Sequence, residues 1–330
     1  MPENVIVQQD CIAGMKQLAD GSVDMVFADP PFNLDKDYKS YADNLEEGGY
    51  VGWCQEWISE CCRVLKPGGS LFLHNIPRWL VRYACMLEAM GLEFCHWIAW
   101  DAPTSPMGNS LQPGHYGILY YVKPPVTGKV FYELRLTHKR CRSCKCLWAD
   151  YGGKKETIPP HGPLVSDVWT DISRLKHRKY RNDHPCQLPV HLLERIVLMA
   201  TRPNDLVLDP FMGTGTTAVA AARLERRFIG FDMEPAYAEM GMRRVARQKV
   251  ASSLNGIHVS CFCNEIVTVR ESDIYDRESK QFKDGWKELF TDWPDTKEKR
   301  IGLNSQKLLL RKKWRDRMAV LETQLKENDA

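Results

Sequence analysis

The sequence of 330 residues predicts an α/β protein with a doubly wound, largely parallel sheet, an inserted region and a C-terminal appendage. Short apolar runs typical of buried strands alternate with segments whose apolar residues recur at helical spacing. Near residue 213 a strand, a glycine-rich loop and a helix follow one another, which is the order of a Rossmann-like cofactor cradle. Between residues 124 and 182 this periodicity disappears, so we place the insertion there.

The first 123 residues alternate strands and helices, as expected for one half of such a core. Apolar residues recur at three- and four-residue spacing between Val51 and Leu65 and predict one long amphipathic helix. That helix must end at Lys66-Pro67-Gly68-Gly69, because a proline and two glycines cannot continue it. The same criteria predict strands over residues 4–8, 23–28, 70–74, 94–100 and 117–123, and helices over residues 12–18 and 79–90.

The segment Asp29-Pro30-Pro31-Phe32 follows the apolar run over residues 23–28, and so begins the loop after a buried strand. Open α/β sheets bind their ligands at that edge. The two prolines stiffen the loop, which presents a carboxylate, carbonyl groups and an aromatic ring. If Asp29 and the Pro30 carbonyl each accept one hydrogen of the amino group of a base, the nitrogen lone pair becomes available, while Phe32 stacks on the ring. The alternative interpretation is an ordinary Pro-Pro turn.

Order returns after residue 183, where Pro189 can begin a helix that extends to Ala200. A short strand then leads into a loop with the glycines Gly213 and Gly215, and the next helix begins there. Glycine lets the backbone approach a ligand, and the free N–H groups of the helix N-terminus suit a carboxylate. Asp232 ends the following strand about 20 residues later, the spacing that places a carboxylate on a ribose diol. The missing third glycine indicates a nucleoside cofactor smaller than a dinucleotide.

Four motifs resemble those of the amino-methylating DNA methyltransferases, in the beta class that has the catalytic motif first and the cofactor motif last. The resemblance covers roughly residues 4–250 and includes the motif order of that class. The motifs are Asp29-Pro30-Pro31-Phe32, Lys66-Pro67-Gly68-Gly69, His184-Pro185-Cys186-Gln187-Leu188-Pro189 and Asp209-Pro210-Phe211-Met212-Gly213-Thr214-Gly215-Thr216.

The resemblance implies a methyltransferase fold, S-adenosylmethionine as methyl donor, and double-stranded DNA whose target base is flipped into the site. The catalytic residues that it implies are Asp29, Pro30, Pro31 and Phe32. The cofactor-binding residues that we expect are Asp10, Asp29, His184, Gln187, Asp209, Phe211, Gly213, Thr214, Gly215, Thr216 and Asp232.

The target atom predicted from the resemblance is the N6 amino group of adenine, because serine at the position of Asp29 is commoner in enzymes that act on the N4 of cytosine. The cytosine N4 group stays the alternative. Phe32 replaces the family's commoner tyrosine but keeps its stacking ring, and Leu188 stands where the family often has lysine. A protein-glutamine or RNA methyltransferase would carry its glycine loop first. A non-catalytic, zinc-containing DNA-binding protein would be expected to have lost Asp29 or the glycine loop.

The insertion is the predicted target-recognition region. The net charge of the chain is only +3, yet residues 135–155 and 174–181 are strongly basic. Such runs suit phosphate contacts, although many are merely solvated surfaces. Cys141 and Cys144 have the Cys-x-x-Cys spacing of half a structural zinc site, with free thiols as the alternative. The candidate ligands for the other half are His138, Cys146, His161 and Cys186.

The predicted domains are the catalytic half of the core over residues 1–123, the insertion over 124–182, the cofactor half over 183–250, and an extension over 251–330. We expect the extension to contact DNA or to mediate a homodimer. A cognate restriction endonuclease acting on the same site is a further partner to consider. No apolar stretch approaches the roughly 20 residues of a membrane span, and the N-terminus lacks a secretion signal, which together predict a cytoplasmic protein without a membrane partner.

The chain has twelve cysteines, which in a cytoplasmic protein are thiols or metal ligands more often than disulfides. Five of them fall in segments that read as core helices or strands, and we expect these five to be packing residues. They are Cys54, Cys61, Cys62, Cys85 and Cys95.

Overall fold

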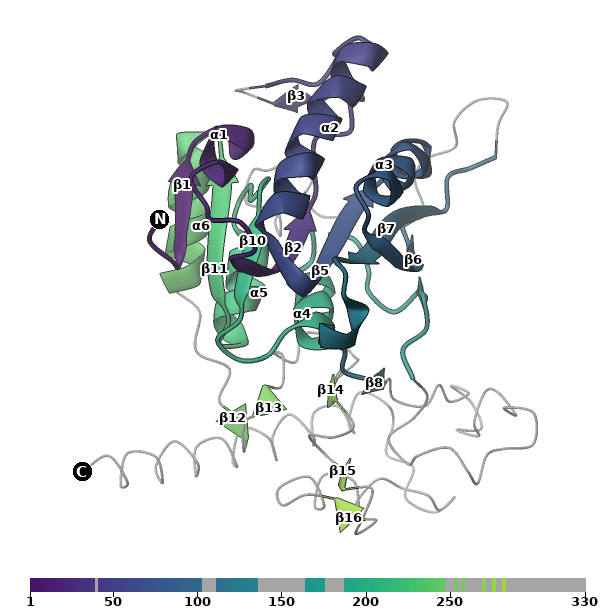
Figure 1. The fold of residues 1–330 in the computed structure, drawn as a ribbon, viewed down its shortest axis with the longest axis vertical. Helices are drawn as coiled ribbons and strands as arrows, with labels where there is room; N and C mark the ends of the chain where they lie inside the picture. The colour runs from purple at the N-terminus through teal and green to yellow at the C-terminus, as the bar shows by residue number, and fades with distance from the viewer. Residues whose placement is uncertain are drawn as a thin grey trace. The chain divides into compact units, whose positions relative to one another are not determined.

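The computed structural model describes residues 1–38, 41–102, 111–135, 164–175 and 187–246, and five two-residue strands after residue 250 (Figure 1). The chain divides into two compact units. The first contains residues 1–133 and 165–250, and the second contains residues 134–164 and 251–330. Cys141, Cys144 and His184 lie outside the described residues, so the predicted zinc site stays a prediction, as do the domain boundaries.

The second unit is described only as short antiparallel pairs. β8 (Leu134–Arg135) pairs with β14 (Val269–Arg270), so a strand of the predicted insertion pairs with a strand of the C-terminal extension. The other pairs are β12 (Ser253–Leu254) with β13 (Ile257–His258), and β15 (Tyr275–Asp276) with β16 (Gln281–Phe282).

The first unit is built on an eight-stranded sheet with the order β1-β11-β10-β2-β5-β7-β6-β9. Only β7 runs against its neighbours, because it pairs antiparallel with both β5 and β6. The predicted α/β fold with a largely parallel sheet is therefore confirmed. The strands are β1 (Val5–Gln8), β2 (Val23–Ala28), β5 (Leu65–Asn75), β6 (Glu93–Asp101), β7 (His115–Val122), β9 (Val168–Trp169), β10 (Leu206–Asp209) and β11 (Arg227–Asp232). A separate hairpin joins β3 (Asp37–Tyr38) and β4 (Tyr41–Ala42).

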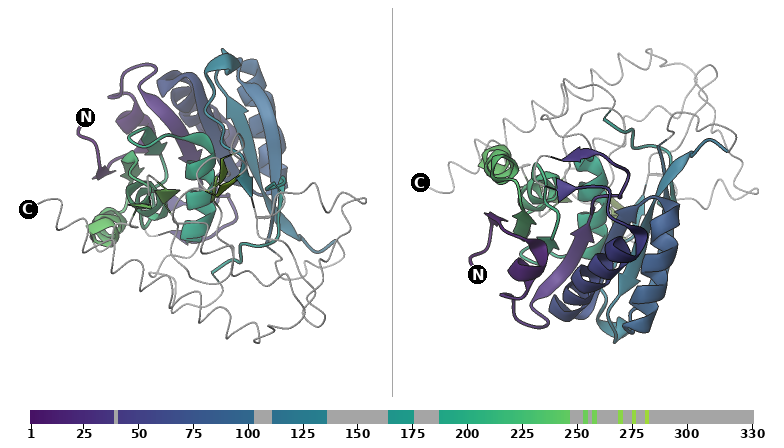
Figure 2. Two further views of the ribbon diagram at one scale, coloured as in Figure 1. Left: turned by 90° about the horizontal axis from the view of Figure 1, so that it is seen from below. Right: turned by 90° about the horizontal axis from the view of Figure 1, so that it is seen from above.

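Helices cover both faces of the sheet (Figures 1 and 2). α1 (Cys11–Met15), α2 (Glu47–Val64) and α3 (Pro77–Ala89) share a core with side chains of β2, β5, β10 and β11. α4 (Val190–Ala200), α5 (Thr216–Arg223) and α6 (Pro235–Ala246) follow one another in the second half of the chain, and α5 packs against both α4 and α6. In the described part of the chain, no helix has the length and apolar character needed to cross a membrane.

The carboxyl ends of the central strands meet at one edge, which fixes the place of the site. β2 and β10 are far apart in sequence but pair in parallel, with Val26 opposite Leu208. β11 lies beside β10 in the same direction. The residues that end or follow these strands, Asp29, Asp209 and Asp232, therefore gather at this edge.

The sequence predicts a strand that begins at residue 70, after Lys66-Pro67-Gly68-Gly69, and this boundary is wrong. α2 ends at Val64 as expected, but β5 already begins at Leu65. The segment forms an irregularity within β5, where the pairing to β2 shifts between Val23 and Met25. Its backbone is paired, because Gly68 N–H donates to the carbonyl of Lys123 at 2.7 Å. Pairing with a segment that lies far away in sequence therefore makes residues 66–69 part of the sheet, although they end the preceding helix.

The cysteine prediction holds for three of the five positions. Cys54, Cys61 and Cys62 are buried between α2 and its neighbours. Cys85 is exposed and Cys95 is half-buried, so their expected role in packing is wrong. Cys85 lies on the exposed face of α3. Because both faces of this helix carry apolar residues, helical spacing alone does not show which face is buried.

Gly68 offers a test of the β5 irregularity. Its φ is +78°, and a Cβ there would lie 2.7 Å from the carbonyl carbon of Gly128. We expect Gly68→Ala to lower the free energy of unfolding by about 2–3 kcal/mol, through backbone strain and a clash that backbone atoms cannot relieve. Gly91→Ala is the matched control, since Gly91 has φ +80° with no atom within 4 Å. That variant should lose only about 1 kcal/mol. Equal losses in urea denaturation would contradict the clash.

Candidate active site

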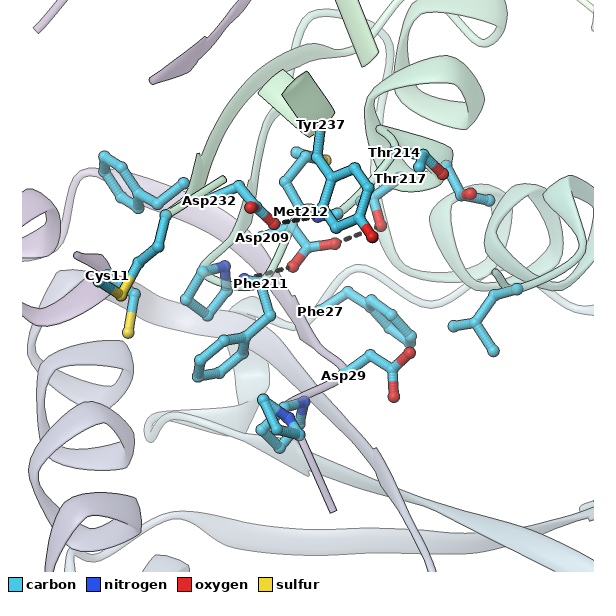
Figure 3. A pocket seen from close by; sticks show the side chains of 18 of the residues that line it. Cys11, Phe27, Asp29, Asp209, Phe211, Met212, Thr214, Thr217, Asp232 and Tyr237 are labelled. Atoms are coloured by element: carbon cyan, nitrogen blue, oxygen red, sulfur yellow. Dashed lines mark hydrogen bonds between the residues drawn. The ribbon is translucent and has the colours of Figure 1, made fainter. Parts of the chain in front are cut away.

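A cavity of about 330 Å³ opens at the carboxyl edge of the strands (Figure 3). It brings together twelve of the residues predicted to be catalytic or to bind the cofactor. These are Asp10, Asp29, Pro30, Pro31, Phe32, Gln187, Asp209, Phe211, Gly213, Thr214, Thr216 and Asp232. Gly215 does not line the cavity. Three further lining residues, Leu188, Pro210 and Met212, belong to the quoted motifs but were not predicted as site residues. The lining residues that sequence reasoning missed are Gln9, Cys11, Phe27, Trp53, Thr217, Phe231, Met233 and Tyr237.

Asp209 shapes the loop between β10 and α5 with both of its carboxylate oxygens. Oδ1 accepts the N–H of Phe211 at 2.9 Å, and Oδ2 accepts the hydroxyl of Thr217 at 2.5 Å. The pKa of Asp209 is raised to about 7, chiefly by burial and to a smaller extent by the carboxylates of Asp29 and Asp232, against the opposing effect of its two hydrogen bonds. The buried carboxyl group of Asp209 thus fixes the conformation of the loop by itself.

Asp232 holds the same loop from the neighbouring strand. Its Oδ2 accepts the N–H of Gly213 at 2.9 Å, and its Oδ1 accepts the N–H of Glu234 at 2.8 Å. Burial raises the pKa of Asp232 to about 6. Gly213 has φ +50°, so the loop needs a residue that tolerates the left-handed region there.

Gly215 has a different task from the one expected for a glycine of this loop. Its φ is +80°, and a Cβ there would lie 2.6 Å from the Cα of Gly241 in α6. Gly215 therefore allows the loop to approach α6. Arg244 of α6 also contacts the loop, because its Nη1 donates to the carbonyl of Thr214 at 2.5 Å. Desolvation lowers the pKa of Arg244 to about 10.

The loop after β2 is fixed by donors from two helices. The hydroxyl of Tyr50 in α2 donates to the carbonyl of Pro31 at 2.6 Å, and Nε1–H of Trp79 in α3 donates to the carbonyl of Phe32 at 2.7 Å. Among the described residues no donor reaches the carbonyl of Pro30. Two of the three carbonyls are thus occupied by the protein, and the one predicted to accept an amino hydrogen is available.

A buried carboxylate supports the rest of this loop. Asp43 is 2% exposed and accepts the N–H groups of Asn33, Leu34 and Lys36 at 2.7, 3.0 and 3.1 Å. Neither Asp43 nor Tyr50 stands out in the sequence. The helical spacing used for the prediction begins at Val51, so it reveals neither the burial of Tyr50 nor where its hydroxyl points.

Phe32 lies within a group of aromatic rings beside Asp29. Its ring centroid is 5.6 Å from that of His74 and 5.9 Å from that of Tyr116. The ammonium of Lys36 lies 5.3 Å from the Phe32 ring centroid. Asp29 itself approaches His74, with 2.7 Å between its Oδ1 and the ring Nδ1. The carboxylate predicted to accept an amino hydrogen is therefore flanked by flat, largely apolar surfaces, which suit a base.

The charges of the cavity select for a cation. Its lining includes four carboxylates and, within the described residues, no lysine or arginine. Asp10 is one of them, and it also caps α1 by accepting the N–H of Ala13 at 2.9 Å. Trp53 and Phe211 add aromatic surface on the side of α2, with ring centroids 5.6 Å apart. A ligand with a flat ring, a ribose diol, an amino group and a sulfonium fits this lining, because the carboxylates offset its positive charges. No group of three or more metal-binding side chains occurs among the residues that the structure describes.

Comparison with known proteins gives consistent matches. A family model described as DNA methylase, N6_N4_Mtase, matches residues 23–243. The Type II methyltransferase M.BamHI of Bacillus amyloliquefaciens is 44% identical over 226 residues, which are 68% of this chain and 53% of that protein. The DNA adenine methyltransferase YhdJ of Escherichia coli (strain K12) is 31% identical over 247 residues, which are 73% of this chain and 82% of that protein.

The chain thus spans about half the length of M.BamHI. Among solved structures, TTHA0409 of Thermus thermophilus, in complex with S-adenosyl-L-methionine, shares the fold with a TM-score of 0.51. That match is 23% identical and covers 74% of this chain and 93% of the other.

The raised pKa of Asp209 predicts a pH dependence of stability. The folded protein keeps this proton up to about pH 7, whereas the unfolded chain releases it near pH 3.8. The contribution of this group to the free energy of unfolding is therefore fully present below pH 3.8 and is lost as the pH rises to 7, by at most about 4 kcal/mol. Asp209→Asn keeps the acceptor for Phe211 and cannot ionise.

Urea denaturation of the ligand-free protein from pH 4 to pH 8 measures this effect. We expect the stability of Asp209→Asn relative to the unsubstituted protein to increase with pH over this range. A stability difference that stays constant with pH would show that Asp209 ionises in the folded protein as it does in the unfolded chain.

Proposed function

Because the chain belongs to the N6/N4 DNA methylase family, we propose that it transfers a methyl group from S-adenosylmethionine to the N6 amino group of adenine in double-stranded DNA. The observation that carries this proposal is the pair of acceptors at the end of β2. Asp29 lines the cavity with its carboxylate, and the Pro30 carbonyl beside it has no donor among the described residues. These are the two groups that an exocyclic amino group needs.

S-adenosylmethionine would supply an activated methyl group on a sulfonium. Asp232 follows the glycine loop at the position suited to its ribose diol, and the loop from Asp209 to Thr216 offers backbone to its amino-acid end. Asp10 and Gln187 complete the contacts that we propose within the described residues. Four carboxylates around this ligand favour the sulfonium over the neutral thioether that remains after transfer, which helps the spent cofactor to leave.

The protein's part in the transfer is to position the acceptor nitrogen. An amino group on a base is a poor nucleophile because its lone pair is delocalised into the ring. Hydrogen bonds to Asp29 and to the Pro30 carbonyl draw this nitrogen towards tetrahedral geometry and free the lone pair. Tyr50 and Trp79 hold the loop, so the two acceptors keep their spacing when the base arrives.

Adenine is preferred over cytosine as the target on two grounds. The family resemblance associates an aspartate at position 29 with adenine N6 enzymes, and YhdJ, with 31% identity, is named an adenine methyltransferase. The matched family includes both N6 and N4 methylases, so the N4 amino group of cytosine is the alternative. It presents the same pair of hydrogens to Asp29 and Pro30, and the two targets differ in ring size.

We assign DNA recognition to the insertion, and its described segment reaches the aromatic rings beside Asp29. Nη1 of Arg174 donates to the hydroxyl of Tyr116 at 3.3 Å. The segment is anchored by an ion pair between the buried side chains of Asp171 and Arg195 and by Nε1–H of Trp100, which donates to the carbonyl of Ile172 at 2.7 Å. A recognition segment fixed so close to the site could link DNA contact to the seating of the base. A homodimer and a cognate endonuclease remain proposed partners.

Loss of the Asp29 carboxylate tests the function. Asp29→Ala should retain the fold and most of the cofactor affinity but lose methylation by at least about 100-fold, because one acceptor of the amino hydrogens is gone. Mass spectrometry of nucleosides from DNA of cells that express each variant measures the product. Glu56→Ala, which removes an exposed carboxylate from α2, is the control and should leave N6-methyladenine unchanged.

Near-normal methylation by Asp29→Ala would refute the mechanism. N4-methylcytosine in place of N6-methyladenine would keep the enzyme class and replace the target base. DNA without either product, from cells that hold folded protein, would contradict the proposed function.

The carboxylates of the cavity predict how cofactor affinity changes with pH. Asp232 and Asp209, with pKa values raised to about 6 and about 7, gain negative charge as the pH rises from 5 to 8. We expect the preference for S-adenosylmethionine over S-adenosylhomocysteine, which lacks the sulfonium charge, to grow over this range by roughly tenfold, or about 1.4 kcal/mol. Titration calorimetry with both ligands measures the ratio. Asp209→Asn should reduce this growth, and a ratio independent of pH would mean that these acids do not sense the sulfonium.

A further inference from the structure

His74 is a buried residue of β5 for which neither the sequence motifs nor the cofactor cavity gives a role. Its side chain is 3% exposed, and its Nδ1 lies 2.7 Å from Oδ1 of Asp29. Its Nε2 is buried without a hydrogen-bond partner in the part of the chain that the structure describes. Leaving such a nitrogen unpaired lowers the stability of the fold, so core packing does not explain the histidine. A leucine would fill similar space without that cost.

The sheet sets His74 beside Asp29. β2 and β5 pair in parallel with Ala28 opposite Leu73; Asp29 directly follows β2, and His74 is the next residue within β5. This register follows from the packing of two long apolar strands. It brings the imidazole and the carboxylate together without any contribution from the loop.

Aromatic rings hold the imidazole in this orientation. The ring centroids of Phe32, Trp100 and Tyr116 lie 5.6, 5.7 and 5.3 Å from that of His74. None of these rings presents a polar atom to Nε2 among the described contacts, so the bond to Asp29 is the one hydrogen bond described for the imidazole. Since His74 does not line the cofactor cavity, it approaches Asp29 from outside that cavity.

We propose that His74 is a positioning residue for Asp29, an inference that rests on the proposed methyl transfer. Nδ1–H donates to Oδ1 and so fixes the rotation of the carboxylate. Oδ2 is then the oxygen presented to the amino group of the target base, at a fixed spacing from the Pro30 carbonyl. Without this bond the Asp29 side chain, which is 18% exposed and lies near the carboxylate of Asp209, turns freely and presents its acceptor in the productive orientation only part of the time.

Two substitutions separate this role from packing. His74→Leu removes the donor and keeps an apolar side chain of comparable size. His74→Asn keeps an N–H donor at the position of Nδ1. With DNA from a host that lacks its own methylases, we expect His74→Leu to lower kcat about 100-fold and to change the Kd for S-adenosylmethionine by less than about twofold. His74→Asn should recover at least about tenfold of the lost kcat.

A double-mutant cycle shows whether His74 acts through Asp29. In an Asp29→Ala background, adding His74→Leu should cause no further loss of kcat, because the group that it positions is absent. A purely structural role would instead lower kcat by the same factor in both backgrounds and would make the asparagine variant no better than the leucine variant. Either of those results, or a kcat of His74→Leu within about threefold of the unsubstituted enzyme, would overturn the proposal.

The same series keeps the two proposals apart. If the unsubstituted protein methylates DNA and Asp29→Ala does not, the proposed function stands whatever His74 does. If the unsubstituted, folded protein methylates no DNA, the proposed function has failed, and with it the role of His74. Thermal unfolding of each variant identifies any loss of kcat that comes from loss of fold.

Discussion

The parallel pairing of β2 with β10 is the constraint on which the site depends, because it joins two halves of the chain that are about 180 residues apart. Asp24 strengthens this joint from within β2. Its Oδ2 accepts the N–H of Leu206 at 2.8 Å, and its Oδ1 receives the ammonium of Lys66 at 2.6 Å. One side chain thus ties β2 to both of its neighbours. Without this pairing the loop after β2 and the glycine loop after β10 would not share a cavity, whatever their own sequences.

Because the strands end at one edge of the sheet, their terminal aspartates lie close together. Burying these carboxylates side by side costs free energy. Asp209 and Asp232 both have raised pKa values, with burial as the first cause. Each carboxylate nevertheless accepts a hydrogen bond from the backbone of the glycine loop, so the acids also fix the conformation of that loop. A positively charged cofactor offsets the repulsion between these acids, so the same two side chains serve both the loop structure and ligand binding.

The parts of the site that sequence reasoning predicted are the local ones. Asp29-Pro30-Pro31-Phe32 and the loop from Asp209 to Thr216 each follow a strand directly, so chain order and apolar runs suffice to place them. The contacts of Tyr50, Trp79 and His74 could not be predicted, because each joins residues at least 19 positions apart and depends on the packing of α2, α3 and β5. The irregularity at Gly68 could not be predicted for the same reason, since its hydrogen bond goes to Lys123.

The two loops of the site are fixed by different means, and this separates binding from chemistry. The glycine loop is held mainly by carboxylates that belong to the cavity itself, so its shape and its charge change together. The loop after β2 is held by neutral donors from α2 and α3 and by the buried carboxylate of Asp43, and none of these groups lines the cavity. Changes in pH or in cofactor charge therefore act first on the cofactor side, while the spacing of Asp29 and the Pro30 carbonyl is preserved. A site built in this way can exchange a cationic cofactor for its neutral product and keep its acceptor geometry through each turnover.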